Sequence, residues 1–439
     1  MAKELKKVLT LGDAVFLIVG NVIGVGIFTT TGIVAKYAGS ALETMIAWAL
    51  GGILSLLGAM TYSELASMFP LAGGDYVYIR EAYGRMPAFL LGWVDLLIIN
   101  SGSIAALALG LSEYTELSSN LSKKLFAGSV IASLSFLNIL GVKKGSKLQN
   151  ILSYGILAFL AGFSILGLLS GNGSWESFKS VPALSSYDLI HILGPAMMPV
   201  LFTYSGWFAS AYVAQEVKKP EVNVPKSLIL GSIIVTCLYL AVNITYLYAI
   251  PFKKLAGIVN VGEISMATLF GREASNAASI FIVFAILSSI NSTIITSPRI
   301  YYAMARDGVF IKDVGRIHNR YNTPHVAITL QMVISLALIA WGSFNRLLIY
   351  VTFIMILSSI FSSLAVFILR SKEAKRKREY RVPLYPYSVI LFLASYTLVA
   401  AGVLIKSPEE SILGLFITLT GVPFYLFWKK GKEEEVHEV

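Results

Sequence analysis

The sequence predicts an all-α membrane protein with about twelve transmembrane helices, for three reasons. Of its 439 residues, 56% are hydrophobic and only 14% are charged, and its mean hydropathy of +0.72 is too apolar for a soluble protein of this length. About twelve stretches are long and apolar enough to cross a bilayer, which takes roughly 20 residues each. Lysine and arginine concentrate in every second connection between these stretches.

The predicted spans follow one another with mostly short connections, so no soluble domain fits between them. Two longer connections, 170–189 and 251–272, carry turn and amphipathic signals. Each could hold a short helix over an outer vestibule or be a plain connector, and the sequence favours neither interpretation. The last segment, 429–439, is charged and is expected to be a mobile tail. The spans cover residues 11–35, 43–68, 86–113, 124–141, 148–169, 190–215, 226–250, 273–304, 324–343, 346–370, 386–405 and 410–428.

The distribution of basic residues predicts the orientation in the membrane. If the N-terminus is inside, all seven inside segments are enriched in Lys and Arg, most densely in 370–381, and the outside segments hold few. We therefore expect a multi-pass protein of the plasma membrane, embedded in the lipid bilayer, with both termini in the cytoplasm.

Several function classes are excluded by composition. The net charge of +10 falls in short clusters between apolar runs rather than along an exposed stripe, so nucleic-acid binding is not expected. The single cysteine, Cys237, lies in an apolar stretch, where we expect it to be buried, and the four histidines have no metal-ligand spacing. No nucleophile, base and orienting residue stand at a recognisable spacing. We expect neither an enzyme nor a bound cofactor.

The first and sixth spans are interrupted near their middle. The first reads GNVIGVGI from Gly20 to Ile27, and the sixth reads TYSGW from Thr203 to Trp207. Because backbone groups in lipid must be paired, matching breaks in two five-helix halves indicate a transporter with an inverted repeat and a midplane site. Gly20 and Gly24 also have the spacing of close helix packing, and the motif alone leaves these two interpretations even.

Five longer motifs follow in order along nearly the whole chain: GNVIGVGIF (20–28), FPLAGGDYVYIREAYG (69–84), GWFASAYVAQEVKKPEVNVPKSL (206–228), SPRIYYAMARDG (297–308) and REYRVPLYP (378–386). They resemble signatures of the amino acid-polyamine-organocation superfamily, most closely its L-type and related prokaryotic amino acid transporters. The resemblance implies the leucine-transporter fold and alternating access. Its first repeat would occupy 1–170, its second 190–370 and two further helices 386–428, before the cytoplasmic tail 429–439.

A site of this kind suits a zwitterionic amino acid. We expect the free N–H groups of Gly24, Val25 and Gly26, at the start of the outer half of the first span, to bind the carboxylate. The ammonium needs acceptors, which the breaks also release. The expected acceptors are the carbonyls of Val22, Phe202, Thr203 and Ser205.

The resemblance also places aromatic side chains around the substrate. It implies a gate at Phe202 and pocket walls at Trp207 and Phe208, although L-type members commonly have Asn at the latter position. No acidic side chain falls in either predicted pocket stretch, so a small neutral amino acid fits better than a cationic one. Asp95 is the nearest exception, as a functional carboxylate or as one paired near the inner end of its span. Asp13 and Glu64 lie near cytoplasmic span ends, where capping or solvated roles are expected.

The resemblance also leads to a specific prediction about which ion is coupled to transport. Proton-coupled members and many exchangers carry a lysine in the fifth helix, and aligning KLQNILSYGIL (147–157) with that helix puts Ile156 at its position. AILSSIN (285–291) is similar to the sodium-coupled pattern in the eighth helix. The implied Na+ ligands are the carbonyls of Gly20, Ile23 and Ala285 and the hydroxyls of Ser288 and Ser289.

The sequence thus predicts a secondary transporter of a neutral L-amino acid, with one Na+ as its coupling ion and no cofactor. The alternatives are an amino acid exchanger or a proton-coupled symporter without sodium, and, from another class, a channel or a sensor that binds without flux. A disulfide-linked heavy subunit is not expected, because no extracellular cysteine exists for the tether.

Overall fold

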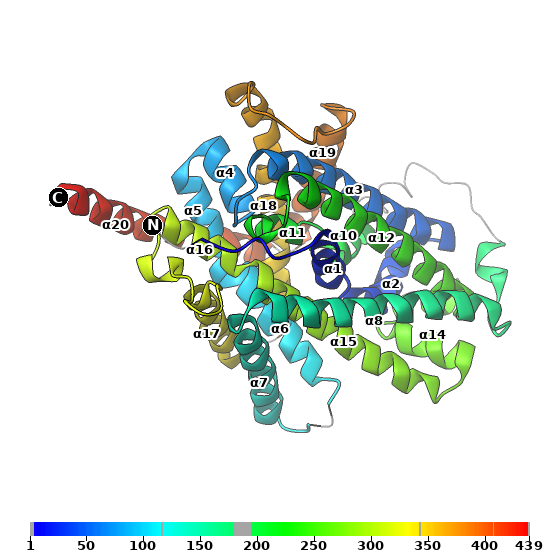
Figure 1. Ribbon diagram of the computed structural model, residues 1–439. Coiled ribbons are helices and arrows are strands. Elements are labelled where there is room, and N and C mark those ends of the chain that lie inside the picture. The colour runs from blue at the N-terminus through cyan, green and yellow to red at the C-terminus, as the bar shows by residue number, and fades with distance from the viewer. Residues whose placement is uncertain (1–3, 116, 180–194, 342–343, 407, 438–439) are drawn as a thin grey trace.

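The computed structural model describes residues 4–115, 117–179, 195–341, 344–406 and 408–437, and within these ranges the protein is helical (Figure 1). Among the described residues, β-type pairing occurs at one isolated parallel bridge, between Leu9 and Val217. The start of the described chain and the end of α20 lie on the same side of the molecule (Figure 1). An even number of membrane crossings would give this arrangement. The all-α class is confirmed.

The helices occur where the apolar stretches predict them. The longest pack side by side, with α12 against α3 and α1, and α15 against α8. The α-helices are α1 (Leu11–Val22), α2 (Gly26–Tyr37), α3 (Ala41–Met68), α4 (Asp75–Tyr83), α5 (Arg85–Val94), α6 (Asn100–Ser112), α7 (Asn120–Ile139), α8 (Val142–Leu169), α10 (Met197–Tyr204), α11 (Ala209–Tyr212), α12 (Pro220–Ala249), α13 (Phe252–Leu255), α14 (Val261–Phe270), α15 (Ala274–Thr296), α16 (Pro298–Arg306), α17 (His325–Trp341), α18 (Phe344–Lys372), α19 (Tyr387–Lys406) and α20 (Pro408–His437). The π-helical turn η1 (Asp95–Ile99) joins α5 to α6, and the 3-10 turns are η2 (Trp175–Phe178), η4 (Ala214–Glu216) and η5 (Lys312–Gly315).

The described residues contain eight helices long and apolar enough to cross a membrane, or nine if α1 and α2 form one broken span. The remaining predicted spans correspond to shorter or less apolar helices: α7, the pair α10 and α11, and α17. Part of the sixth span, 190–194, lies outside the described residues. The twelve crossings and the inverted repeat therefore stay predictions.

The longer connection at 251–272 is helical, which decides between its two interpretations. It holds α13 and α14, and the N–H of Gly257 donates to the carbonyl of Gly32 in α2 at 2.7 Å. The connection at 170–189 contains η2, and its residues from 180 onward lie outside the described part. At the other end of the chain, α20 continues as a helix into the predicted tail.

The first span is broken as predicted, three residues after Gly20. Helix α1 begins with a capping box, in which Thr10 and Asp13 each bond the other's backbone N–H, and it ends at Val22. Helix α2 starts at Gly26, and the two axes meet at 47°. The expected capping role of Asp13 is confirmed.

The second break is also present, and it touches the first. Helix α10 ends at Tyr204 and α11 begins at Ala209. Between them, Gly206 has φ +103°, and a Cβ there would lie 2.2 Å from Oδ1 of Asn21. Glycine is thus required twice at this position, for its backbone conformation and for the close approach of the first break.

Gly20 is packed against a buried amide network. A Cβ at Gly20 would lie 1.7 Å from Nε2 of Gln149 and 2.4 Å from Oγ of Ser288. The Gln149 amide donates to Ser288 Oγ at 2.8 Å and to Ser153 Oγ at 3.0 Å, and it accepts from Asn291 at 2.9 Å. This network joins α1, α8 and α15, so Gly20 serves close packing.

Two expectations about single residues are wrong. Glu64 is not solvated: it is fully buried in α3 and pairs with Arg370 at 2.6 Å, while the backbone N–H of Val382 donates to it at 2.8 Å. Glu64, at a predicted cytoplasmic helix end, therefore links α3 to α18 through its ion pair with Arg370. Cys237 is not buried, because it lies on the exposed face of α12.

Replacing Gly20 with Ala should destabilise the protein, because the added methyl group would push Gln149 and Ser288 apart. Overpacking of this kind costs about 1–3 kcal/mol. The measurement is the apparent unfolding temperature of the purified protein in detergent, and we expect it to fall. Gly155→Ala is the matched control, since it lies in α8 with no atom within 4 Å of its Cβ position. Equal unfolding temperatures for the two variants would contradict the packing role of Gly20.

Candidate functional site

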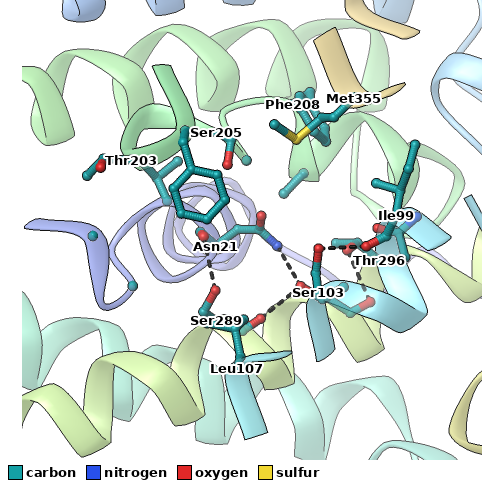
Figure 2. Close-up of a pocket in the computed structure, with 18 of the residues that line it drawn as sticks. Asn21, Ile99, Ser103, Leu107, Thr203, Ser205, Phe208, Ser289, Thr296 and Met355 are labelled. Atoms are coloured by element: carbon teal, nitrogen blue, oxygen red, sulfur yellow. Dashed lines mark hydrogen bonds between the residues drawn. The ribbon is translucent and has the colours of Figure 1, made fainter. Parts of the chain in front are cut away.

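A pocket lies where the two breaks meet (Figure 2). Its walls come from the α1–α2 break, the α10–α11 break, η1 with α6, α15 and α18. Asn21, Ser103 and Ser289, from three of these elements, face it in Figure 2. No side chain that lines the pocket is charged. The lining residues are Asn21, Val22, Gly24, Val25, Gly26, Ile99, Asn100, Ser103, Ala106, Leu107, Phe202, Thr203, Ser205, Gly206, Phe208, Ala209, Tyr212, Ser289, Thr293, Thr296 and Met355.

The pocket brings together all but one of the residues predicted to bind substrate. The exception is Trp207, which is buried against α3 and has its ring 4.8 Å from that of Tyr62. It lines a small adjoining cavity together with Tyr396. The predicted residues on the main pocket are Val22, Gly24, Val25, Gly26, Phe202, Thr203, Ser205 and Phe208.

The backbone donors at the first break differ from the expected set. The N–H of Gly24 donates to the carbonyl of Val22 at 2.9 Å, so it is not free. The N–H groups of Val25 and Gly26 have no hydrogen-bond partner within the described residues. They stand at the N-terminal end of α2, where unpaired donors and the helix dipole favour an anion. Two of the three predicted donors are therefore available.

The glycines beside these donors have different surroundings. A Cβ at Gly26 would lie 2.7 Å from Oγ1 of Thr203, so this glycine lets α2 approach α10. A Cβ at Gly24 would have only Ser289 nearby, at 3.7 Å. Gly24 thus borders open space in the pocket, whereas Gly20 and Gly26 are needed for packing.

The predicted carbonyl acceptors are held in place by a residue that the sequence did not single out. The hydroxyl of Tyr239, in α12, lies 3.0 Å from the carbonyl oxygen of Val22 and 3.3 Å from that of Thr203. The carbonyl of Phe202 accepts from the N–H of Ser205 at 3.1 Å. The carbonyl oxygens of Phe202 and Thr203 each keep a second lone pair for the pocket, whereas that of Val22 already accepts from both the Gly24 N–H and the Tyr239 hydroxyl.

Ser288 lies against Gly20, and both predicted hydroxyl ligands of the ion, Ser288 and Ser289, are already hydrogen-bonded, while Ile23 and Ala285 are buried. Ser288 accepts from Nε2 of Gln149, and Ser289 donates to the carbonyl of Asn21 at 3.2 Å. The Gly24 N–H, which would pair with the carbonyl of Gly20 in a continuous helix, is turned to Val22 instead. Ile156 is fully buried in α8. An amide nitrogen therefore stands beside Ser288, where the prediction puts a cation.

The third wall of the pocket was missed because no break marks it in the sequence. It includes Asn100 and Ser103 around the start of α6, and Thr293 and Thr296 on α15. Asn21 also escaped notice, although its amide donates to Ser292 at 3.2 Å and so joins the break to α15. The available signal was polarity, since amides and hydroxyls inside apolar spans are expensive unless they have partners.

Known proteins resemble this chain over nearly its whole length. A model of the amino acid permease family matches residues 9–424. The serine/threonine exchanger SteT of Bacillus subtilis is 32% identical over 98% of both chains. The human b(0,+)-type amino acid transporter 1 is 30% identical over 97% of this chain and 88% of its own, and the human cystine/glutamate transporter is 29% identical over 97% and 87%. The chain belongs to the amino acid permease family, whose members are transporters and not enzymes.

Proposed function

We propose that the protein is a secondary transporter that carries a neutral L-amino acid across the plasma membrane by alternating access. The observation that carries this proposal is the pocket between the two broken helices. It offers free N–H groups of Val25 and Gly26 on one side and the carbonyls of Phe202 and Thr203 on the other, and none of the described side chains in its lining is charged.

This arrangement matches the charges of a zwitterion. The carboxylate would bind at the N-terminal end of α2, and the ammonium would donate to carbonyl oxygens near the end of α10. Apolar residues such as Phe202, Phe208 and Leu107 border the remaining space and suit a side chain without charge. A cationic or anionic side chain would lack a counter-charge in this pocket.

Alternating access needs contacts that can open on one side of the pocket. A buried ion pair joins Glu216, just after α11, to Arg299 of α16 at 2.7 Å. On the same basic side of the sequence pattern, Glu64 pairs with Arg370. We propose that this side faces the cytoplasm together with both termini, and that these ion pairs hold the inner path closed until the helices of the two repeats move.

Sodium coupling stays a prediction. It is supported by the position of Ser289 against the first break and by the absence of a lysine at Ile156. The hydrogen bond from Gln149 to Ser288 favours the second candidate, amino acid transport without sodium, because an N–H donor competes with a cation for the same hydroxyl oxygen. Exchange and proton coupling both belong to this second candidate, and a serine/threonine exchanger is among the relatives.

Transport itself is tested by counterflow in proteoliposomes. Vesicles loaded with an unlabelled neutral L-amino acid, such as serine, alanine or leucine in separate preparations, should accumulate the labelled form transiently and saturably, and should discriminate against the D-enantiomer. A channel would give no accumulation, and a sensor would bind without flux. Absence of counterflow for every neutral L-amino acid tested would contradict the proposal.

The ion is tested in the same vesicles by comparing uptake in sodium and in potassium. Sodium coupling predicts faster uptake under an inward sodium gradient, and a loss of that acceleration in Ser288→Ala and Ser289→Ala. Equal initial rates in the two salts would reject sodium coupling and leave exchange or proton coupling. Counterflow at equal sodium on both sides shows whether each variant still carries the amino acid.

Gly24→Ala tests the position of the substrate. The new methyl group would project into the pocket without a clash, so the variant should fold like the wild type but bind its amino acid roughly ten-fold more weakly, about 1.4 kcal/mol. Ligand-induced thermal stabilisation measures the affinity, and unfolding without ligand measures stability. Gly155→Ala, outside the pocket, should change neither. Wild-type affinity in Gly24→Ala would place the substrate elsewhere.

A further inference from the structure

A second, smaller cavity adjoins the substrate pocket and contains two carboxyl groups. It has room for about one water molecule. Five residues line both spaces, so they form the wall between them. They are Ile99, Asn100, Phe208, Tyr212 and Met355. The remaining lining residues of this acidic cavity are Asp75, Asp95, Ser358 and Ser359.

Within the described residues each of the two carboxyl groups has one oxygen without a hydrogen-bond partner, and Asp95 has the longer contact at its other oxygen. Asp95 is 3% exposed, and its Oδ2 has no hydrogen-bond partner within the described residues. Its Oδ1 has one long contact, from the amide of Asn100 at 3.3 Å. Asp95 begins the π-helical turn η1, which interrupts an otherwise regular span, and such turns are frequent at functional sites.

Asp75 differs from Asp95 because hydroxyl groups donate to it. The hydroxyl of Tyr212 lies 2.7 Å from Oδ2 of Asp75, and that of Ser358 lies 3.5 Å away. These donors stabilise a carboxylate acceptor at Asp75. None of the ion pairs among the described residues includes Asp75 or Asp95.

Two buried carboxyl groups without a cationic side chain require a compensating positive charge. The space leaves no room for an ammonium or guanidinium side chain of a substrate. Within the described residues, the titratable groups that face the two carboxyl groups supply none either, since they are phenolic. They are Tyr212 from α11, Tyr301 from α16, whose hydroxyl donates to the Asp95 carbonyl at 3.3 Å, Tyr62 from α3 and Tyr78 from α4.

We propose that Asp95 is a proton-binding site and that its proton moves together with the amino acid. The inference rests on the proposed transport function and names its coupling ion. It assigns to Asp95 the role that the resemblance gives to a fifth-helix lysine, at a cavity that Ser288 does not line.

The shared wall gives the proton a way to respond to the substrate. Asn100 contacts Asp95 on one side and lines the substrate pocket on the other. Tyr212 belongs to α11, the continuation of the second broken helix, and its hydroxyl is bound to Asp75. A movement of α11 during alternating access therefore changes the contacts of this acidic cavity.

The test measures proton and amino acid fluxes in the same proteoliposomes. Addition of the neutral L-amino acid found in counterflow, to wild-type vesicles in weak buffer, should make the outer medium more alkaline, and an inward proton gradient should accelerate uptake several-fold. In Asp95→Asn both effects should disappear, whereas Asp95→Glu should keep them. Ser359→Ala, which removes an oxygen from the acidic cavity without removing an ionisable group, should keep them as well.

The outcomes separate this inference from the proposed function. Wild-type counterflow without any proton flux overturns the proton site alone, whereas absence of counterflow overturns the transport proposal. Proton flux that persists in Asp95→Asn at the wild-type ratio to amino acid also overturns the inference. If Asp95→Asn does not fold, Asp75→Asn takes its place: loss of proton coupling in Asp75→Asn with counterflow intact would assign the proton to Asp75 and overturn the inference, whereas the inference predicts that coupling is kept. Lysine or arginine uptake that depends on Asp95 without proton flux would make the acidic cavity a substrate site and contradict the proposal.

Discussion

The hydroxyl of Tyr239 is the contact on which the arrangement of the two broken helices depends. It bonds the carbonyl of Val22, where α1 ends, and the carbonyl of Thr203, near the end of α10. Both carbonyls lose their helical partners at the breaks, and a buried carbonyl without a partner is costly in the interior of a membrane protein. One phenol on α12 thus satisfies both breaks and fixes their distance. The pocket exists because this contact holds two irregular segments side by side without filling the space between them and α6.

The small residues of the first break divide between packing and binding. Gly20 makes room for the Gln149 amide, and Gly26 makes room for Thr203, so both allow neighbouring helices to approach. Gly24 alone borders open space. Its N–H nevertheless closes a turn onto Val22, which leaves donation to Val25 and Gly26. The free backbone donors therefore begin one residue closer to α2 than the predicted set, at Val25 in place of Gly24.

Much of this could be predicted from the sequence. The hydropathy predicted the positions of the helices, and the motifs around Gly24 and Gly206 predicted both breaks and eight of the residues that line the pocket. The remainder depends on side chains that only the fold brings together. Tyr239 is one of many aromatic residues in apolar spans, and nothing in its local sequence marks it. Gln149 lies seven residues before Ile156 and fills space beside Ser288 only because α8, α1 and α15 meet there. Trp207 sits next to the break but turns toward α3, since side-chain direction is set by packing.

The central claim is that backbone atoms of the two breaks bind the amino acid directly. Its most direct test is an experimental structure of the protein with its neutral amino acid bound, at a resolution that separates carboxylate from ammonium. The account predicts the carboxylate within hydrogen-bond distance of the Val25 and Gly26 N–H groups, and the ammonium against the carbonyls of Phe202 and Thr203, the latter beside the Tyr239 hydroxyl. An amino acid bound through Asn100 and Ser103, with no contact to either break, would contradict it.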